Sequence, residues 1–123
     1  MAKILVVEDE RTLNEAYELV LKKEGHQVRV AYNGKEALDV FKMQKPDLVL
    51  LDLRMPQMDG VEFLKQLKPK ENKVKAKIII FSNYDDQKEI DSAFAHGATR
   101  YILKAWSSPK ELAKVVDETL KQQ

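Results

Sequence analysis

The chain has 123 residues, of which 44% are hydrophobic and 33% are charged, and its formal net charge at pH 7 is +1. This composition indicates one folded domain, and the near-neutral charge gives no general attraction to nucleic acid or to anionic membranes. The absence of cysteine excludes disulfides, iron–sulfur clusters and thiol catalysis. No apolar run is long enough to span a membrane, and the first ten residues are too short and too acidic for a signal peptide, so we expect a cytoplasmic protein.

Five short apolar runs predict β-strands, and several of them are apolar throughout, as is typical of strands covered on both faces. The predicted strands are residues 4–7, 28–31, 48–53, 78–81 and 101–103. Between them, apolar residues recur at helical spacing. The predicted helical faces are Leu13, Ala16, Tyr17, Val20 and Leu21, then Ala37, Leu38 and Phe41, then Val61, Leu64 and Leu67.

Two further helices complete the pattern. One is expected near residues 86–95. The last one should begin with Ser108 as the N-cap, Pro109 at the first helical position and Glu111 at the third. Its buried face would comprise Leu112, Val115, Val116 and Leu120. Because strands and helices alternate strictly, the sequence predicts an α/β fold with a doubly wound parallel sheet and helices on both faces.

Two features outside this pattern could carry function but have simpler explanations. Residues 65–77 contain six lysines, which could bind phosphates, although a solvated loop between the third helix and the fourth strand explains them better. His26 precedes the second strand, and His96 lies beside Gly97 where the fourth helix should end. We expect structural roles for both histidines.

Polar residues stand at or near the carboxyl ends of four of the five predicted strands. They are Glu8, Asp9 and Glu10 after the first strand, Asp52 in the third, Ser82 after the fourth and Lys104 after the fifth. In open α/β sheets, ligands bind at the carboxyl ends of the strands. We therefore expect these side chains to converge on one edge of the sheet.

These residue types are consistent with two explanations when each is taken singly. Acidic residues favour the N-terminal end of a helix, and Ser82 could be a turn or cap hydroxyl. Together with Asp52, however, the acidic residues would repel one another in a half-buried crevice unless a cation compensated them, and Mg²⁺ is a cation that prefers such oxygen ligands. With Lys104 opposite, the group is typical of phosphoryl transfer, in which Asp52 would be the nucleophile that forms an acyl phosphate.

Four motifs give this group a family context. ILVVEDE, PDLVLLDLRMPQMDG, IIIFSN and GATRYILK occur in that order along the chain. Over nearly its whole length the sequence resembles the receiver domain of two-component response regulators, of the stand-alone type. The resemblance implies a flavodoxin-like (βα)5 fold with strand order 2-1-3-4-5, one receiver domain over residues 1–123, and a regulatory phosphoacceptor that is not an enzyme acting on a separate substrate.

The same resemblance implies a role for each site residue. Asp52 would receive a phosphoryl group from a kinase phosphohistidine. Mg²⁺ would be held directly by Asp9, by Asp52 and by the backbone carbonyl of Arg54, and by Glu8 through a bound water.

The resemblance also implies how the phosphoryl group is sensed. Ser82 and Lys104 would contact it, and Ser82 and Tyr101 would switch conformation. The implied partners are a histidine kinase or phosphotransfer protein and a downstream protein. The latter would bind the fourth helix, fifth strand and fifth helix, at residues 86–95, 101–103 and 111–120. A second copy of the chain could also bind, whereas direct binding to nucleic acid or a membrane is not expected.

The chain departs from the family's pattern at several positions. Glu8 replaces the usual aspartate, and Asn83 stands where a small residue is usual. The sequence Lys104-Ala105 replaces Lys-Pro, so we predict a trans peptide bond there, because a cis bond without proline costs about 2.5–4 kcal/mol. Trp106, the only tryptophan, should report magnesium binding and phosphorylation by its fluorescence.

Three alternatives remain at this stage. Asn83 and Ala105 would suit a degenerate receiver that binds partners without being phosphorylated. A flavodoxin-like cofactor binder would share the fold, although an acidic loop after the first strand repels phosphate. A haloacid-dehalogenase-type phosphatase needs a second acid where this chain has Arg54. In a receiver, Arg54 and Tyr84 would flank the attacking water, and their bulk predicts a long-lived phosphorylated state.

Overall fold

The computed structural model describes residues 2–82, 86–104 and 108–122. Its centre is a five-stranded parallel sheet with strand order β2-β1-β3-β4-β5, as the family resemblance implies. The strands are β1 Lys3–Val7, β2 Gln27–Ala31, β3 Leu48–Leu51, β4 Lys77–Ser82 and β5 Arg100–Leu103.

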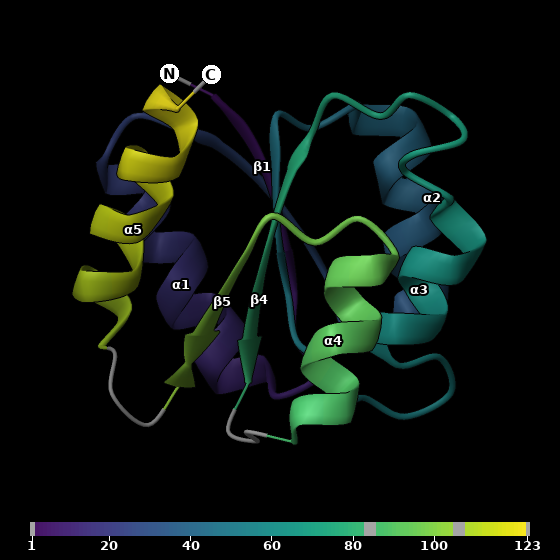
Figure 1. Ribbon diagram of the computed structural model, residues 1–123. Helices are drawn as coiled ribbons and strands as arrows, with labels where there is room; N and C mark the ends of the chain where they lie inside the picture. The colour runs from purple at the N-terminus through teal and green to yellow at the C-terminus, as the bar shows by residue number, and fades with distance from the viewer. Residues whose placement is uncertain (1, 83–85, 105–107, 123) are drawn as a thin grey trace.

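Five helices cover both faces of the sheet. They are α1 Arg11–Lys23, α2 Gly34–Gln44, α3 Gly60–Leu67, α4 Gln87–Ala95 and α5 Pro109–Lys121. Figure 1 shows α1 and α5 on one face and α2, α3 and α4 on the other. The carboxyl ends of β4 and β5 point to the lower edge of this view, opposite the chain termini. The predicted doubly wound architecture is confirmed.

The continuous apolar runs are explained by a separate core on each face of the sheet. Along β1, Leu5 and Val7 pack toward α2, α3 and α4, whereas Ile4 and Val6 pack toward α1 and α5. All four side chains are 0% exposed. Since successive side chains of a strand point to opposite faces, a strand covered on both faces must be apolar at every position.

The predicted start of α5 is confirmed in detail. Ser108 accepts a hydrogen bond from the backbone N–H of Glu111, and the Glu111 side chain accepts one from the backbone N–H of Ser108, which completes a capping box with Pro109 at the helix start. The fourth predicted helix begins one residue later than expected, because Asp86 is its N-cap and its side chain accepts from Lys88 N–H.

The third strand is shorter than predicted, since β3 ends at Leu51 rather than at residue 53. Asp52 N–H still donates to the Val7 carbonyl (3.0 Å), but the Leu53 carbonyl accepts from Gly60 N–H (2.9 Å) instead of from a neighbouring strand. A Cβ atom at Gly60 would lie 2.5 Å from the carbonyl oxygen of Asp52. The backbone at the N-terminus of α3 therefore packs directly against the backbone of Asp52.

The lysine-rich segment 65–77 runs from α3 into β4, and its middle forms hydrogen-bonded turns, with Asn72 N–H donating to Lys68 O and Val74 N–H to Pro69 O. Five of the six lysines are exposed and Lys77 is partly buried. No carboxylate among the described residues forms an ion pair with them. The segment is therefore a solvated connection, as predicted. No described helix is long and apolar enough to cross a membrane.

Candidate functional site

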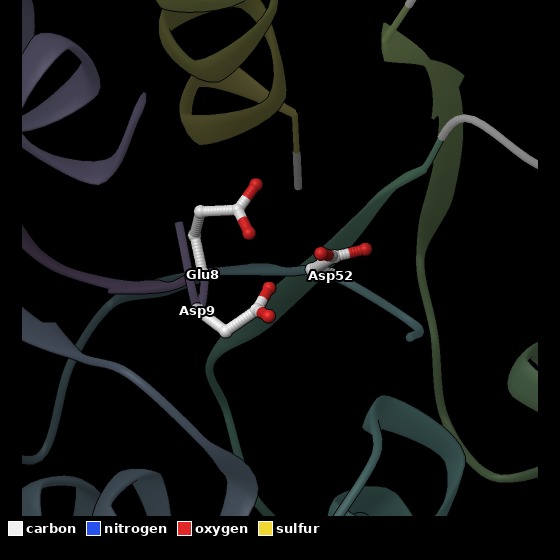
Figure 2. A group of neighbouring side chains, drawn as sticks. All are labelled: Glu8, Asp9 and Asp52. Carbon is white, nitrogen blue, oxygen red and sulfur yellow. The ribbon is translucent and has the colours of Figure 1, made fainter. Parts of the chain in front are cut away.

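Three carboxylates meet where β1 and β3 end. Glu8 and Asp9 follow β1, and Asp52 follows β3. One oxygen from each lies within 4.8 Å of the others. Figure 2 shows Glu8 and Asp9 leaving the chain in different directions, with the Asp9 carboxylate turned toward Asp52. The three residues differ in burial. Glu8 is 1% and Asp52 5% exposed, whereas Asp9 is exposed at the rim.

Lys104 compensates two of these carboxylates. It follows β5, and its Nζ donates to Glu8 Oε1 and to Asp52 Oδ2, the latter at 3.1 Å. Its side chain is 10% exposed, and its Nζ lies 5.0 Å from the centre of the Phe81 ring. Burial opposes the charge on this lysine, but the hydrogen bond to Glu8 and the charges of Asp52 and Glu8 outweigh burial and raise the pKa of Lys104. Lys104 is therefore a cation at neutral pH.

Asp9 is compensated less, because the ion pairs of Lys104 are with Glu8 and Asp52. Its partial burial, its hydrogen bond with Glu8 and the negative charge of Glu8 raise its pKa, and the more distant Lys104 only partly opposes them. A carboxyl group whose charge is opposed in this way gains most from a nearby cation. The three carboxylates thus supply the hard oxygen donors that Mg²⁺ prefers, and the residues present fit that ion.

The remaining predicted residues lie on neighbouring elements. Ser82 ends β4 and is 0% exposed. Tyr101 pairs with Ile80 across β4 and β5 and packs, partly buried, against the core on the side of α2, α3 and α4. The backbone N–H of Arg54 donates to Asp52 Oδ1 (3.4 Å), and its guanidinium forms an ion pair with Glu89 of α4 (2.9 Å).

Six of the seven predicted site residues lie at or beyond the carboxyl ends of the strands, whereas Tyr101 lies within β5, level with the last residue of β3. The expectations for Asn83, Tyr84, the Lys104–Ala105 bond and Trp106 concern positions outside the described residues, so they stay predictions.

The two histidines lie away from this edge and make structural contacts. His26 Nδ1 accepts from Ala2 N–H (3.1 Å), and its Nε2 lies 2.9 Å from Asp117 Oδ1. His96 is the C-cap of α4, and its Nδ1 lies 2.7 Å from the Ser92 carbonyl. The contacts of His26 link the start of β1 to α5, and the contact of His96 caps the C-terminal end of α4.

Sequence reasoning missed two residues next to the site. Asn14 is 0% exposed and bonds the carbonyl of Glu8, yet it occupies a helix face that was expected to be apolar. A polar residue within an apolar stripe was the available signal. Glu89 was missed because its partner Arg54 lies 35 positions away along the chain, and nothing in either local sequence indicates the contact.

Comparison with known proteins agrees with this geometry. Residues 4–117 match the family described as the response regulator receiver domain. A CheY-like receiver domain protein of Methanospirillum hungatei is 26% identical, with a TM-score of 0.88 over 98% of this chain and 94% of that one. The chemotaxis protein CheY4 of Vibrio cholerae is 27% identical, with a TM-score of 0.86 over 96% and 98% of the two chains.

A third structure, the signal receiver domain of a response regulator from Bermanella marisrubri, is 30% identical, with a TM-score of 0.82 over 94% of this chain and 95% of that one. The family match favours the receiver interpretation over a flavodoxin-like cofactor binder and over a dehalogenase-type phosphatase. With the strand order, the acidic edge and the matched residues in agreement, this chain belongs to the response regulator receiver domain family of two-component systems.

Proposed function

We propose that the protein accepts a phosphoryl group on Asp52 in a magnesium-dependent reaction and passes the signal to a partner protein. The observation that carries the proposal is the placement of Asp52. The Asp52 residue is 5% exposed, and its carboxylate accepts a hydrogen bond from Lys104 and lies at the same sheet edge as Glu8 and Asp9. Such a site holds one nucleophilic oxygen among groups that can balance an incoming anionic group.

The metal shell would be divided unequally among the carboxylates. Both oxygens of Glu8 already accept hydrogen bonds, Oε1 from Lys104 and Oε2 from the backbone N–H of Glu10 (3.2 Å). Both oxygens of Asp52 accept hydrogen bonds as well, from Arg54 N–H (3.4 Å) and from Lys104 (3.1 Å). The proposed division of roles therefore follows the family resemblance, with Glu8 acting through a bound water and Asp9, Asp52 and the backbone carbonyl of Arg54 acting as direct ligands. When bound, Mg²⁺ supplies positive charge that attracts the phosphoryl oxygens.

The chemical step would be an exchange at phosphorus. One oxygen of the Asp52 carboxylate forms a bond to phosphorus while the bond from phosphorus to the donor's histidine nitrogen breaks, and the electron pair of that bond stays on the nitrogen. Lys104, which already donates to Asp52, would hold its ammonium against the transferred group. Ser82 would donate its hydroxyl hydrogen to a phosphoryl oxygen. The protein thus contributes position and charge.

Transmission of the signal would use the neighbouring surface. Tyr101 lies on β5, the edge strand next to β4, and Ser82 pairs with Leu103 of β5. Movement of Ser82 toward a phosphoryl group would therefore be transmitted to Tyr101 through the pairing of β4 with β5. The proposed output surface comprises α4, β5 and α5, where a downstream protein or a second copy would bind. A histidine kinase or a phosphotransfer protein would be the donor.

A direct test is incubation with a small-molecule phosphodonor, such as acetyl phosphate, with and without Mg²⁺, followed by intact-mass measurement. We expect the mass of one added phosphoryl group only when Mg²⁺ is present. Asp52→Asn should prevent the adduct. Asp39→Asn is the matched control, because Asp39 is an exposed residue of α2, and it should be labelled like the wild type.

Two outcomes would contradict the proposal. Full labelling of the Asp52→Asn variant would show that another residue is the acceptor. Failure of the folded wild-type protein to gain the phosphoryl mass from any small donor or from a kinase would favour a degenerate receiver that binds partners without phosphorylation.

A further inference from the structure

Asn14 is a fully buried amide in α1, at 0% exposure. Its Nδ2 group donates to the backbone carbonyl of Glu8 (3.0 Å) and to that of Ala31 (3.1 Å). Glu8 follows β1, and Ala31 is the last residue of β2. One side chain therefore ties α1 to the carboxyl ends of two adjacent strands.

The backbone of the same segment is held at two more points. Glu8 N–H donates to the Ala31 carbonyl (3.1 Å), and Asn14 N–H donates to the Glu10 carbonyl (2.9 Å). Asn14 thus contacts the residue before Asp9 through its side chain and the residue after Asp9 through its backbone. The Glu8–Asp9 peptide unit is thus held to α1 by the Asn14 side chain, and the Glu10–Arg11 unit by the first backbone hydrogen bond of the helix.

This arrangement carries a cost that a different residue would avoid. The Oδ1 atom of Asn14 is buried and has no hydrogen-bond partner within residues 2–82, 86–104 and 108–122. A buried polar atom without a partner is unfavourable, whereas an apolar side chain on the same helix face would incur no such penalty. What the amide adds is two N–H donors on one short arm, and both reach carbonyls at the edge of the site.

We infer that Asn14 is a positioning residue of the metal site: it fixes the backbone from which Glu8 and Asp9 project and so sets the affinity for Mg²⁺. This inference rests on the proposed function. Groups that orient metal ligands without touching the metal typically change metal affinity by about 10- to 100-fold when they are removed. The effect should therefore appear in the binding of Mg²⁺ itself, without any phosphodonor.

The test is titration of the full chain with Mg²⁺ by calorimetry and by the NMR amide shifts of residues 8–10. Asn14→Ala removes both donors, and Asn14→Ser leaves a single shorter one, which also serves if the alanine variant does not fold. We expect the dissociation constant of either folded variant to rise by about tenfold. Even without Mg²⁺, the NMR amide shifts of Glu8 and Asp9 in the Asn14 variants should differ from those of the wild type.

Thr119→Val is the matched control. Thr119 is also 0% exposed and helical, and its Oγ1 donates to the Val115 carbonyl (2.7 Å) in α5. This variant should lower the melting temperature but leave the dissociation constant for Mg²⁺ within twofold of wild type. The inference is overturned if a folded Asn14 variant binds Mg²⁺ within twofold of wild type, or if Thr119→Val weakens binding equally. Absence of binding by the wild type would instead overturn the magnesium part of the proposed function, and this inference with it.

Discussion

Replacement of Lys104 by methionine should expose the electrostatic cost of the site. Lys104 donates to both Glu8 and Asp52, which are 1% and 5% exposed. Methionine keeps much of the apolar stem near Phe81 but removes the charge. Two nearly buried carboxylates are then left facing each other without the cation that balances them.

The magnitude follows from the geometry. Two unit charges at the 3.1 Å separation of Lys104 Nζ and Asp52 Oδ2 attract by about 5 kcal/mol at an effective dielectric constant of about 20. The variant also avoids the cost of burying the ammonium, which offsets part of this loss. Removing one partner of a buried ion pair typically costs about 3–5 kcal/mol. We expect a loss of that size in the free energy of unfolding at pH 7.

Urea unfolding of wild type and variant, each at several pH values, measures this loss. The deficit should be complete at pH 7 and shrink as the pH rises above 10.5, because the pKa of Lys104 is raised in the folded protein and the stability that its charge contributes is lost when the ammonium deprotonates. Added Mg²⁺ should restore part of the stability at pH 7. Lys114→Met is the control, since Lys114 is an exposed residue of α5, and it should change stability by less than about 0.5 kcal/mol. A deficit below about 1 kcal/mol, or one that does not depend on pH, would refute the reasoning.

Three further measurements follow from the same structure. Burial, and then the charge of Glu8, raises the pKa of Tyr17 from 10.0 to about 12. The stability that this neutral phenol contributes is therefore complete below pH 10, and about 2–3 kcal/mol should be lost as the pH rises to 12. Urea unfolding at alkaline pH should show that loss in wild type and not in Tyr17→Phe. The exposed Arg54–Glu89 ion pair should give a coupling of only about 0.2–1 kcal/mol in a double-mutant cycle, weaker in high salt; a larger, salt-independent value would contradict this. In calorimetric titrations, Asp9→Asn should weaken Mg²⁺ binding more than Glu8→Gln does. Equal losses of affinity would contradict the proposal that Asp9 is a direct ligand and Glu8 is not.

The fold was predictable because its main signals are local. Continuous apolar runs, helical periodicity and the Ser108 capping box each depend on a few consecutive residues, and strict alternation of strands and helices then allows few topologies. The end of β3 was not predictable in the same way. It depends on Gly60, whose N–H bonds the Leu53 carbonyl after the chain has turned into α3. Leu53 follows Asp52 in the sequence, and nothing in residues 48–53 alone indicates that strand pairing stops at Leu51.

The candidate site was predictable to the level of which residues meet, and less so to the level of how they bond. Strand ends and the family resemblance placed Glu8, Asp52 and Lys104 at one edge. They did not predict that Lys104 would donate to Glu8 as well as to Asp52. Nor did they predict that the Asn14 amide lies buried on α1 and donates to the Glu8 carbonyl. The first contact depends on Lys104 reaching across the sheet edge from the end of β5, and the second on how α1 packs against the end of β1. No local sequence pattern records either arrangement.

The charges at this edge give an argument for a divalent cation that does not depend on any coordination geometry. Counted with all three carboxylates ionised and Lys104 protonated, the cluster of Glu8, Asp9, Asp52 and Lys104 has a formal charge of −2. A phosphoryl donor is itself anionic and would be repelled by such a cluster, most strongly where Glu8 and Asp52 are shielded from water. A single divalent ion brings the formal charge to zero. Lys104 cannot take that role alone, because the hydrogen bonds it makes to Glu8 and Asp52 already commit its charge to two carboxylates. A second source of positive charge would therefore favour the proposed transfer to Asp52, and Asp9, whose pKa is raised by burial and by Glu8, is the carboxylate that such a charge would stabilise most.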